Sequence, residues 1–245
     1  LPIGVDGREL YLPQYGLGRL VEGPGDIATM ITTFLAAPVL QPDNALVTGY
    51  DFLVDQAQAM ESTLSDQGVS QIDTLINNQW TAQDFRDMAF DATPYDLVLL
   101  NSHFDHFRFF PNDNDNVAAT EFNGRSSKLI LSVGCHSGLN VADNATTLAY
   151  TGADFAQTFA SQGATFIGNT GFGYGDGDLL AYSERLMLNF TQQLGYNPSP
   201  NQTATLPTVG EALMQAKQRY LNSLGNGALT AYDEKVLAEM VLYGL

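Results

Sequence analysis

Two hydrophobic patterns alternate along the chain. Short continuous apolar runs recur, and each ends at a glycine or a small polar residue; they occupy 45–49, 96–102, 128–134 and 164–168. Runs of this kind are typical of parallel strands that are covered on both faces. The segment 71–76 is a further strand candidate. The pattern therefore predicts a buried, mostly parallel sheet.

Between these runs, the apolar positions follow the helical period. Such segments lie at 27–35, 53–68, 82–90, 154–162, 179–195 and 208–225. The last of them begins with a capping-box pattern, because Thr208 is followed three residues later by Glu211. Strands and helices alternate from one end to the other without a visible repeat or linker. We therefore predict one α/β domain over residues 1–245, with helices on both faces of the sheet.

Composition narrows the range of partners. The hydrophobic fraction of 44% and the charged fraction of 15% are those of a folded protein. Lys and Arg number 10 against 27 Asp and Glu, for a formal net charge of −17, which repels phosphate and argues against nucleic acid and membranes as partners. The sequence contains one cysteine, so we expect no internal disulfide and no cysteine-based zinc cluster. Its apolar runs are far shorter than a membrane span.

A histidine and the one cysteine directly follow the two strongest predicted strands. His103 comes after 96–102, and Cys135 comes after 128–134. The carboxyl ends of neighbouring parallel strands meet at one edge of a sheet, so we expect the two side chains to lie together. A nearby imidazole helps a thiol to become the nucleophilic thiolate, and backbone N–H groups in the turns can hold an oxyanion. An inert core cysteine and a loop histidine are the alternatives.

The same residues resemble a known group of peptidases. A hydrophobic strand ending in His, here LVLLNSH, followed by one ending in Cys, here LILSVGC, is shared by caspases, legumains and gingipains. Further stretches resemble the gingipain-type family in the right order: YLPQYGLGRL, DNALVTGYDF, TVGEALMQAKQRYL and the terminal EKVLAEMVLYGL. The resemblance covers nearly the whole chain. It implies a caspase-like three-layer fold and a cysteine endopeptidase that needs no redox cofactor.

The resemblance also implies a role for individual residues. His103 would be the general base and Cys135 the nucleophile, with the backbone N–H groups of Cys135 and Phe104 as the oxyanion hole. The family usually has glycine after the histidine, where this chain has Phe104. Some relatives carry a glutamate near Gly49 that supports the histidine, and this chain has none at that point.

The family implies a substrate pocket as well. The glycine-rich loop after 164–168 would form its wall, with Phe172 or Tyr174 covering the substrate side chain. Enzymes of this type that read arginine or lysine use a carboxylate placed after the strand 45–49, where Asp51 and Asp55 are available. We expect Asp51 to bind a basic side chain, and the alternative is that it caps the following helix. The expected partners are a peptide or protein substrate and other domains of a longer precursor, in a secreted or cell-surface protein.

Other candidate sites and functions stay open. Asp113 and Asp115 lie in an Asn- and Asp-rich stretch whose oxygen ligands suit calcium, although a solvated turn is the alternative. His103 and His106 form a His-x-x-His pair that is weak as a metal site. His136 is a rival base, but it should point away from the thiol of its neighbour. The alternative functions are a catalytically degenerate gingipain-like binding or secretion module and a metal-assisted hydrolase.

Overall fold

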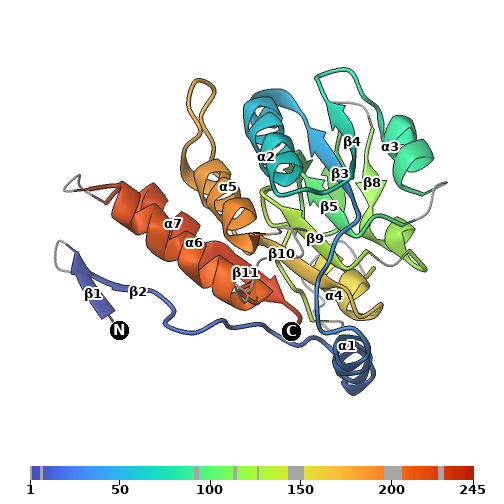
Figure 1. Ribbon diagram of the computed structural model, residues 1–245, viewed down its shortest axis with the longest axis horizontal. Helices are drawn as coiled ribbons and strands as arrows, with labels where there is room; N and C mark the ends of the chain where they lie inside the picture. Colours follow the sequence, from blue (N-terminus) through green and yellow to red (C-terminus); the bar gives the residue numbers. More distant parts are fainter. Residues whose placement is uncertain are drawn as a thin grey trace.

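A six-stranded sheet forms the centre of the protein, as a computed structural model shows (Figure 1). The structure describes residues 2–5, 8–90, 94–112, 115–125, 127–142, 152–195, 206–225 and 229–245. The strand order is β11-β10-β9-β5-β3-β4, and all neighbours are parallel except β10 and β11. The strands are β3 (Asn44–Gly49), β4 (Gln71–Ile76), β5 (Leu97–Leu100), β9 (Leu129–Ser132), β10 (Thr165–Asn169) and β11 (Met240–Tyr243).

Helices cover both faces of the sheet, so the predicted three-layer α/β architecture is confirmed (Figure 1). One face carries α2 (Val54–Asp66), α5 (Tyr182–Leu194), α6 (Val209–Ser223) and α7 (Ala231–Glu239). The other carries α3 (Ala82–Ala89) and α4 (Phe155–Ala160), with α1 (Pro24–Ala36) packed outside α4. Strand side chains alternate between the two cores: Leu129 and Leu131 of β9 face the first, and Ile130 faces the second.

The two cores differ in chemistry. The first is largely aliphatic, whereas the second contains most of the buried aromatic rings. Phe85 and Phe109 meet edge to face with their ring centroids 4.8 Å apart, and Phe159 lies 5.0 Å from Phe166. The helices over this second core are short, at 8 and 6 residues for α3 and α4. Large rings bury much area per residue, so they suit a face with little helix to cover it.

A small antiparallel sheet follows β5 and was not predicted. It consists of β6 (His103–Phe104), β7 (Arg108–Phe110) and β8 (Val117–Ala118), followed by a 3-10 helix, η2 (Ala119–Phe122). The strands have only two or three residues, too few for a readable alternation. The terminal strand β11 and the hairpin of β1 (Pro2–Val5) with β2 (Arg8–Tyr11) were not assigned as such from sequence either.

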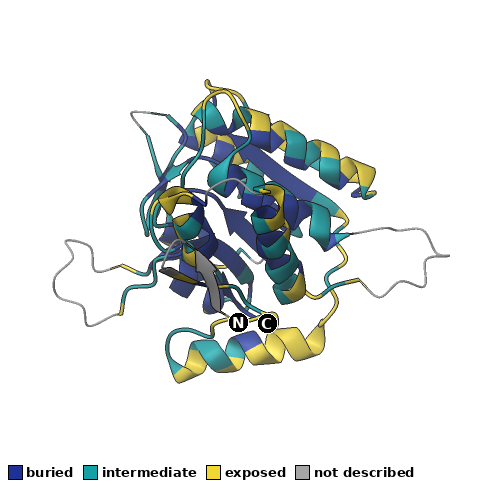
Figure 2. Ribbon diagram, turned by 90° about the vertical axis from the view of Figure 1, so that its left-hand side faces the viewer, coloured by how far each residue is buried: buried dark blue, intermediate teal, exposed yellow. Residues whose placement is uncertain are grey.

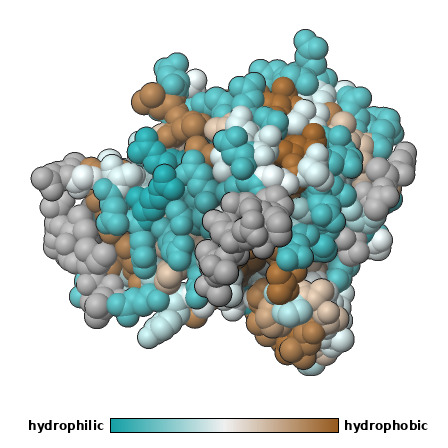
Figure 3. Space-filling view, in the orientation of Figure 1, coloured by the Kyte–Doolittle hydropathy of each residue, from teal (hydrophilic) through white to brown (hydrophobic). Residues whose placement is uncertain are grey.

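The predicted helices are all present within a few residues, and the Thr208 cap is confirmed. Its Oγ1 accepts a hydrogen bond from the backbone N–H of Glu211 at 3.2 Å. Burial follows the layers, with the sheet buried and the outer helix faces exposed (Figure 2). The far side of α1 exposes Phe34 and Leu35, and apolar surface gathers there (Figure 3). Among the described residues, no helix has the length and apolar character to cross a membrane.

The aromatic core generates a stability prediction. Phe109 is fully buried between Phe85, Phe104 and Trp80. Phe109→Ala should lower the free energy of unfolding by about 3–5 kcal/mol, because the ring leaves a cavity that the sheet cannot close. Leu35→Ala, at a side chain that is 71% exposed, is the control and should change it by less than about 0.5 kcal/mol. Urea unfolding of both variants measures the difference, and equal effects would contradict the assignment of this core.

Candidate active site

His103 and Cys135 lie at the same height on two adjacent strand ends. β5 pairs with β9 in parallel, with Leu100 opposite Ser132. His103 and Cys135 each come three residues after this pair. Both line one narrow pocket, together with Phe52, Gly173 and Tyr174. The structure thus brings together the two residues that the sequence suggested for nucleophilic catalysis.

An acidic residue contacts the histidine from a third strand end. The Asp51 Oδ2 atom lies 3.1 Å from the Nε2 atom of His103. The rings of Tyr50 and Phe52 meet the imidazole edge on, with centroids 6.0 and 5.8 Å away. The two partners are about half exposed, so the pair adds little to stability. The pair matters more for the orientation of the histidine. The contact with Asp51 fixes the imidazole ring through Nε2 and leaves the Nδ1 atom for another partner.

The backbone of Asp51 is held in a costly conformation. Its φ is +58°, in the left-handed region, which costs a non-glycine residue on the order of 1–3 kcal/mol. Its N–H donates to Oδ1 of Asn78 at 2.7 Å, and this bond ties it to the loop after β4. Such strained residues gather at functional sites, where the surroundings fix them.

The structure gives Asp51 a partner that neither expectation named. We predict contact with a basic substrate side chain, and the structure places the Asp51 carboxylate against His103, in the supporting role that the resemblance gives to a glutamate. Contact with substrate stays a prediction. The capping alternative is wrong, because α2 begins after Leu53 and no side chain caps it. Sequence reasoning looked for an acid near Gly49, and the strained turn brings one from two residues further on.

Cys135 sits in a tight turn after β9. Its Sγ atom lies 3.7 Å from the carbonyl oxygen of Gly173, across the pocket. The next residue, His136, has φ of +55° and donates its backbone N–H to Gly171 at 2.6 Å. The His136 ring packs on Phe172 with a centroid distance of 4.7 Å and is not among the pocket residues. His103 is therefore the better placed base.

The backbone N–H groups expected to form an oxyanion hole are Cys135 and Phe104. Asp105 donates its N–H to Arg108, which makes this a hydrogen-bonded pair of the β6–β7 hairpin. In an antiparallel ladder such pairs alternate with unbonded ones, so the neighbouring pair, Phe104 and Phe109, is unbonded. The Phe104 N–H thus points away from β7, at the free edge of the small sheet. Among the described residues, the Cys135 N–H has no acceptor either.

The side chain that replaces the family's glycine turns away from the pocket. Phe104 is 6% exposed and stacks on Phe109 in the aromatic core. Its ring occupies the space in which a Cβ atom of Gly134 would lie. Gly134 therefore makes room for Phe104, and the two turns that carry His103 and Cys135 pack directly on each other.

Carboxylates gather behind the pocket wall. Tyr174 lines the pocket, and its hydroxyl accepts a hydrogen bond from Lys235 at 3.0 Å, whereas Phe172 is exposed at the rim. Behind them lies Glu184, a buried residue that sequence reasoning missed, whose Oε2 accepts the backbone N–H of Asp176 at 3.0 Å. Burial is the main cause that raises the pKa of Glu184 to about 7, and the negative charges of the nearby Asp55 and Asp176 act in the same direction.

The calcium prediction is not tested. Asp113 lies outside the described residues, and the Asp115 carboxylate accepts a hydrogen bond from the backbone of Asn116. In the part of the chain that the structure describes, no group of three or more His, Cys, Asp or Glu side chains could hold a metal. His103 and His106 therefore form no such group there.

Comparisons with known proteins agree with this geometry at the level of fold. No protein-family model matches the chain, and no curated protein sequence does. The crystal structure of the Arg-specific cysteine proteinase gingipain R superposes with a TM-score of 0.64 at 14% identity, over 93% of this chain and 53% of that one. The complex of Porphyromonas gingivalis RgpB pro- and mature domains gives 0.62 at 15% identity, over 93% and 54%.

The chain has a gingipain-like fold. It spans about half the length of the gingipain chains that it matches, and at this identity the likeness concerns the fold alone.

The buried glutamate generates a pH prediction. Its folded pKa is raised, so the stability that protonated Glu184 contributes is present at low pH and is lost as pH rises from about 4.5 to about 7. Glu184→Gln removes this loss, so the melting temperature of the variant relative to wild type should be higher at about pH 8 than at about pH 4.5. Glu211→Gln, at the same capping position of α6 but exposed, is the control. A pH-independent difference for Glu184→Gln would contradict this.

Proposed function

We propose that the protein is a cysteine endopeptidase in which Cys135 is the nucleophile, His103 the general base and Asp51 the residue that positions the histidine. The observation that carries the proposal is the convergence of three strand ends. β3, β5 and β9 are adjacent, and the residues just after them contact each other or line one pocket. A nucleophile, a base and an orienting acid are the parts that this chemistry needs.

In the proposed mechanism each atom has a task. Because Nε2 of His103 faces Asp51, Nδ1 is the nitrogen that takes the proton from the Cys135 thiol. The thiolate attacks the carbonyl carbon of the scissile bond, and the N–H groups of Cys135 and Phe104 hold the oxyanion. The protonated histidine then gives its proton to the leaving amine as the C–N bond breaks. Water, activated by the same histidine, hydrolyses the thioester and restores the thiol.

The second candidate is a catalytically degenerate binding or secretion module with the same fold. The feature that favours this candidate is Phe104, at a position where the gingipain-type family usually has glycine. The burial of that ring against Gly134 leaves the backbone edge of Phe104 free, which weakens this argument. The two candidates differ in a simple observable, since a degenerate module has no activity to lose when its thiol is alkylated.

Substitutions in the site provide the test. Cys135→Ala should abolish peptide hydrolysis, and Asp51→Asn should lower kcat by about 10²–10⁴-fold, because the imidazole loses the partner that orients it. Asp66→Asn, an equal change of charge at the exposed far end of α2, is the matched control and should retain full activity. Circular dichroism confirms folding. Hydrolysis that survives both Cys135→Ala and iodoacetamide would overturn the proposal.

A preference for arginine or lysine on the acyl side of the cleaved bond extends the proposal. Gingipain R is described as Arg-specific. Here Asp55 and Asp176 carry carboxylates next to Glu184, behind the wall that Phe52 and Tyr174 form. With Asp51 engaged by His103, Asp55 is the freer of the two carboxylates predicted for this role. A guanidinium gains charge-assisted hydrogen bonds there that a neutral side chain cannot make.

A substrate panel that differs only at this residue measures the preference. We expect kcat/KM to be highest for Arg or Lys, and Asp55→Asn to lower it for these substrates by about tenfold, through loss of about 1.4 kcal/mol of ionic binding. The same variant should leave cleavage after Leu unchanged. Cleavage after Leu or Asp that equals cleavage after Arg would refute the preference.

The remaining expectations accompany this proposal. A secreted or cell-surface location is expected from the likeness to gingipain. Further domains of a longer precursor are the expected protein partners, since an RgpB mature domain is known in complex with its pro-domain. Calcium at Asp113 and Asp115 stays a prediction.

A further inference from the structure

A second hollow lies at the same edge of the sheet, away from the catalytic pocket. It is an open groove of about 550 Å³ between the end of β4, the loop that follows and helix α3. Leu75, Asn77, Gln79 and Trp80 line one side. Asp84, Asp87 and Met88 of α3 line the other, and no residue is shared with the catalytic pocket.

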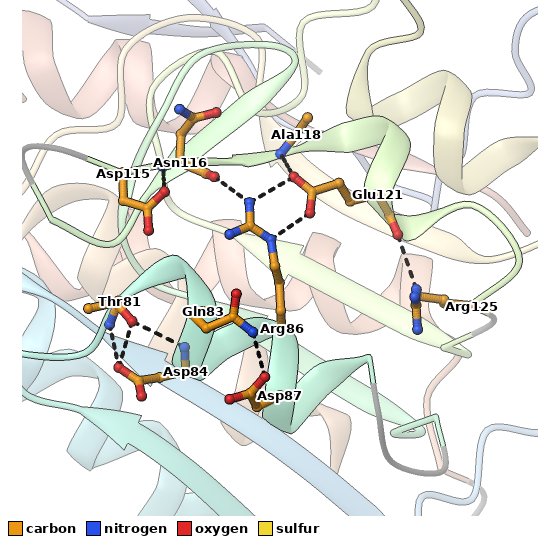
Figure 4. A network of polar contacts seen from close by, with 10 residues as sticks. All are labelled: Thr81, Gln83, Asp84, Arg86, Asp87, Asp115, Asn116, Ala118, Glu121 and Arg125. Atoms are coloured by element: carbon orange, nitrogen blue, oxygen red, sulfur yellow. Dashed lines mark hydrogen bonds and ion pairs between the residues drawn. The ribbon is translucent and has the colours of Figure 1, made fainter.

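The rim of the groove carries negative charge, and none of the ion pairs in the described part of the chain involves it. Asp84 and Asp87 are its charged residues, and none of the lining residues is basic. Hydrogen bonds from Thr81 lower the pKa of Asp84, so this carboxylate stays ionised. The nearest cation, Arg86, reaches the other way (Figure 4). It binds Glu121 at 2.7 Å and the carbonyl oxygen of Asn116 at 2.9 Å.

The floor of the groove is apolar. Leu75 and Trp80 are 9% and 3% exposed, and Met88 completes the surface. The indole N–H of Trp80 is already bonded to the carbonyl oxygen of Gly49 at 3.0 Å, so this residue adds no free polar group to the floor. A ligand that matches has an aliphatic stem and a cationic head, as lysine and arginine side chains do.

The position of the groove relates it to the substrate chain. β4 lies three places from β9 in the sheet order, and neighbouring strands are about 4.8 Å apart. The groove is thus about 14 Å from the strand that carries Cys135, and an extended peptide covers this span with about four residues. The loop beside the groove also contains Asn78, which holds Asp51. The groove and the catalytic pocket therefore share one edge and one supporting loop.

We propose that this groove binds a lysine or arginine side chain of the polypeptide substrate, about four residues away from the cleaved bond. The assignment to substrate rests on the proposed peptidase function, but the binding of a basic side chain does not. A free polyamine offers the same chemistry, and the experiments separate the two sources.

Trp80 allows a binding test that needs no activity, because it is the one tryptophan of the chain and it lines the groove. The probe is N-acetyl-argininamide, added to protein whose Cys135 is blocked by iodoacetamide. We expect a saturable change in Trp80 emission, with Kd on the order of 1 mM, that weakens as salt is added. N-acetyl-citrullinamide, which has nearly the same shape but no charge, should give none.

Variants assign the signal to the groove. Asp87→Asn should remove it, because the groove loses a negative charge. The variant should still fold, since among the described residues Asp87 bonds only to Gln83 of its own helix and does not cap α3. Asp66→Asn, the charge-matched control at the end of α2, and Asp55→Asn, behind the wall of the catalytic pocket, should keep it. A signal that citrulline reproduces, or that survives Asp87→Asn, would overturn the proposal even if the enzyme proved to be an active peptidase.

Peptide substrates test the link to hydrolysis. Peptides identical around the cleaved bond carry lysine or alanine about four residues from it, on one side or the other. We expect the lysine peptide on one side to have a KM lower by about threefold to tenfold with kcat unchanged, and Asp87→Asn to equalise the pair. Spermidine that quenches Trp80 while lysine leaves KM unchanged on both sides would show that the occupant is a free amine, contrary to the proposal.

Discussion

The register between β5 and β9 is the constraint on which the site depends. Leu100 is opposite Ser132, so the chain leaves both strands at the same height and reaches His103 and Cys135 after equal intervals. Side chains alternate between two packed cores along each strand, and a slip of one residue would exchange every inward side chain for an outward one. Because both faces are buried, neither core tolerates that exchange. The packing that fixes the fold therefore also fixes how His103 and Cys135 lie relative to each other.

The aromatic core extends this constraint to the backbone of the site. Phe104 belongs at once to the hairpin that carries His103 and to the ring cluster under α3 and α4. Its partner across the two turns is Gly134, which must lack a side chain for the ring to fit. With a glycine at position 104, the space beside Gly134 would have to be filled by another side chain. The contact between Phe104 and Gly134 holds the two turns together.

The sequence predicted the central strands and the pair His103 and Cys135, because a continuous apolar run that ends at a polar residue can be recognised from the local sequence alone. It missed the strands β6–β8, which are too short to show a period. It also missed the contact between Asp51 and His103, which depends on a left-handed turn and on Asn78 from another loop. Glu184 has the sequence of an ordinary helix-capping glutamate, and only tertiary packing buries it. Local patterns carry local information, and these features arise from non-local contacts.

The distribution of charge at this edge of the sheet has a chemical consequence. Asp51, Asp55 and Asp176 lie around the catalytic pocket, and Asp84 and Asp87 line the neighbouring groove. A negative field of this kind attracts cationic chains. It also opposes the negative charge that develops on the carbonyl oxygen in the transition state, which two backbone N–H groups must then stabilise. A bound lysine or arginine brings a positive charge into that field and offsets part of the repulsion. A lysine or arginine in the substrate would thus raise the rate of the chemical step as well as the binding affinity, because its positive charge offsets the repulsion between the acidic residues and the oxyanion.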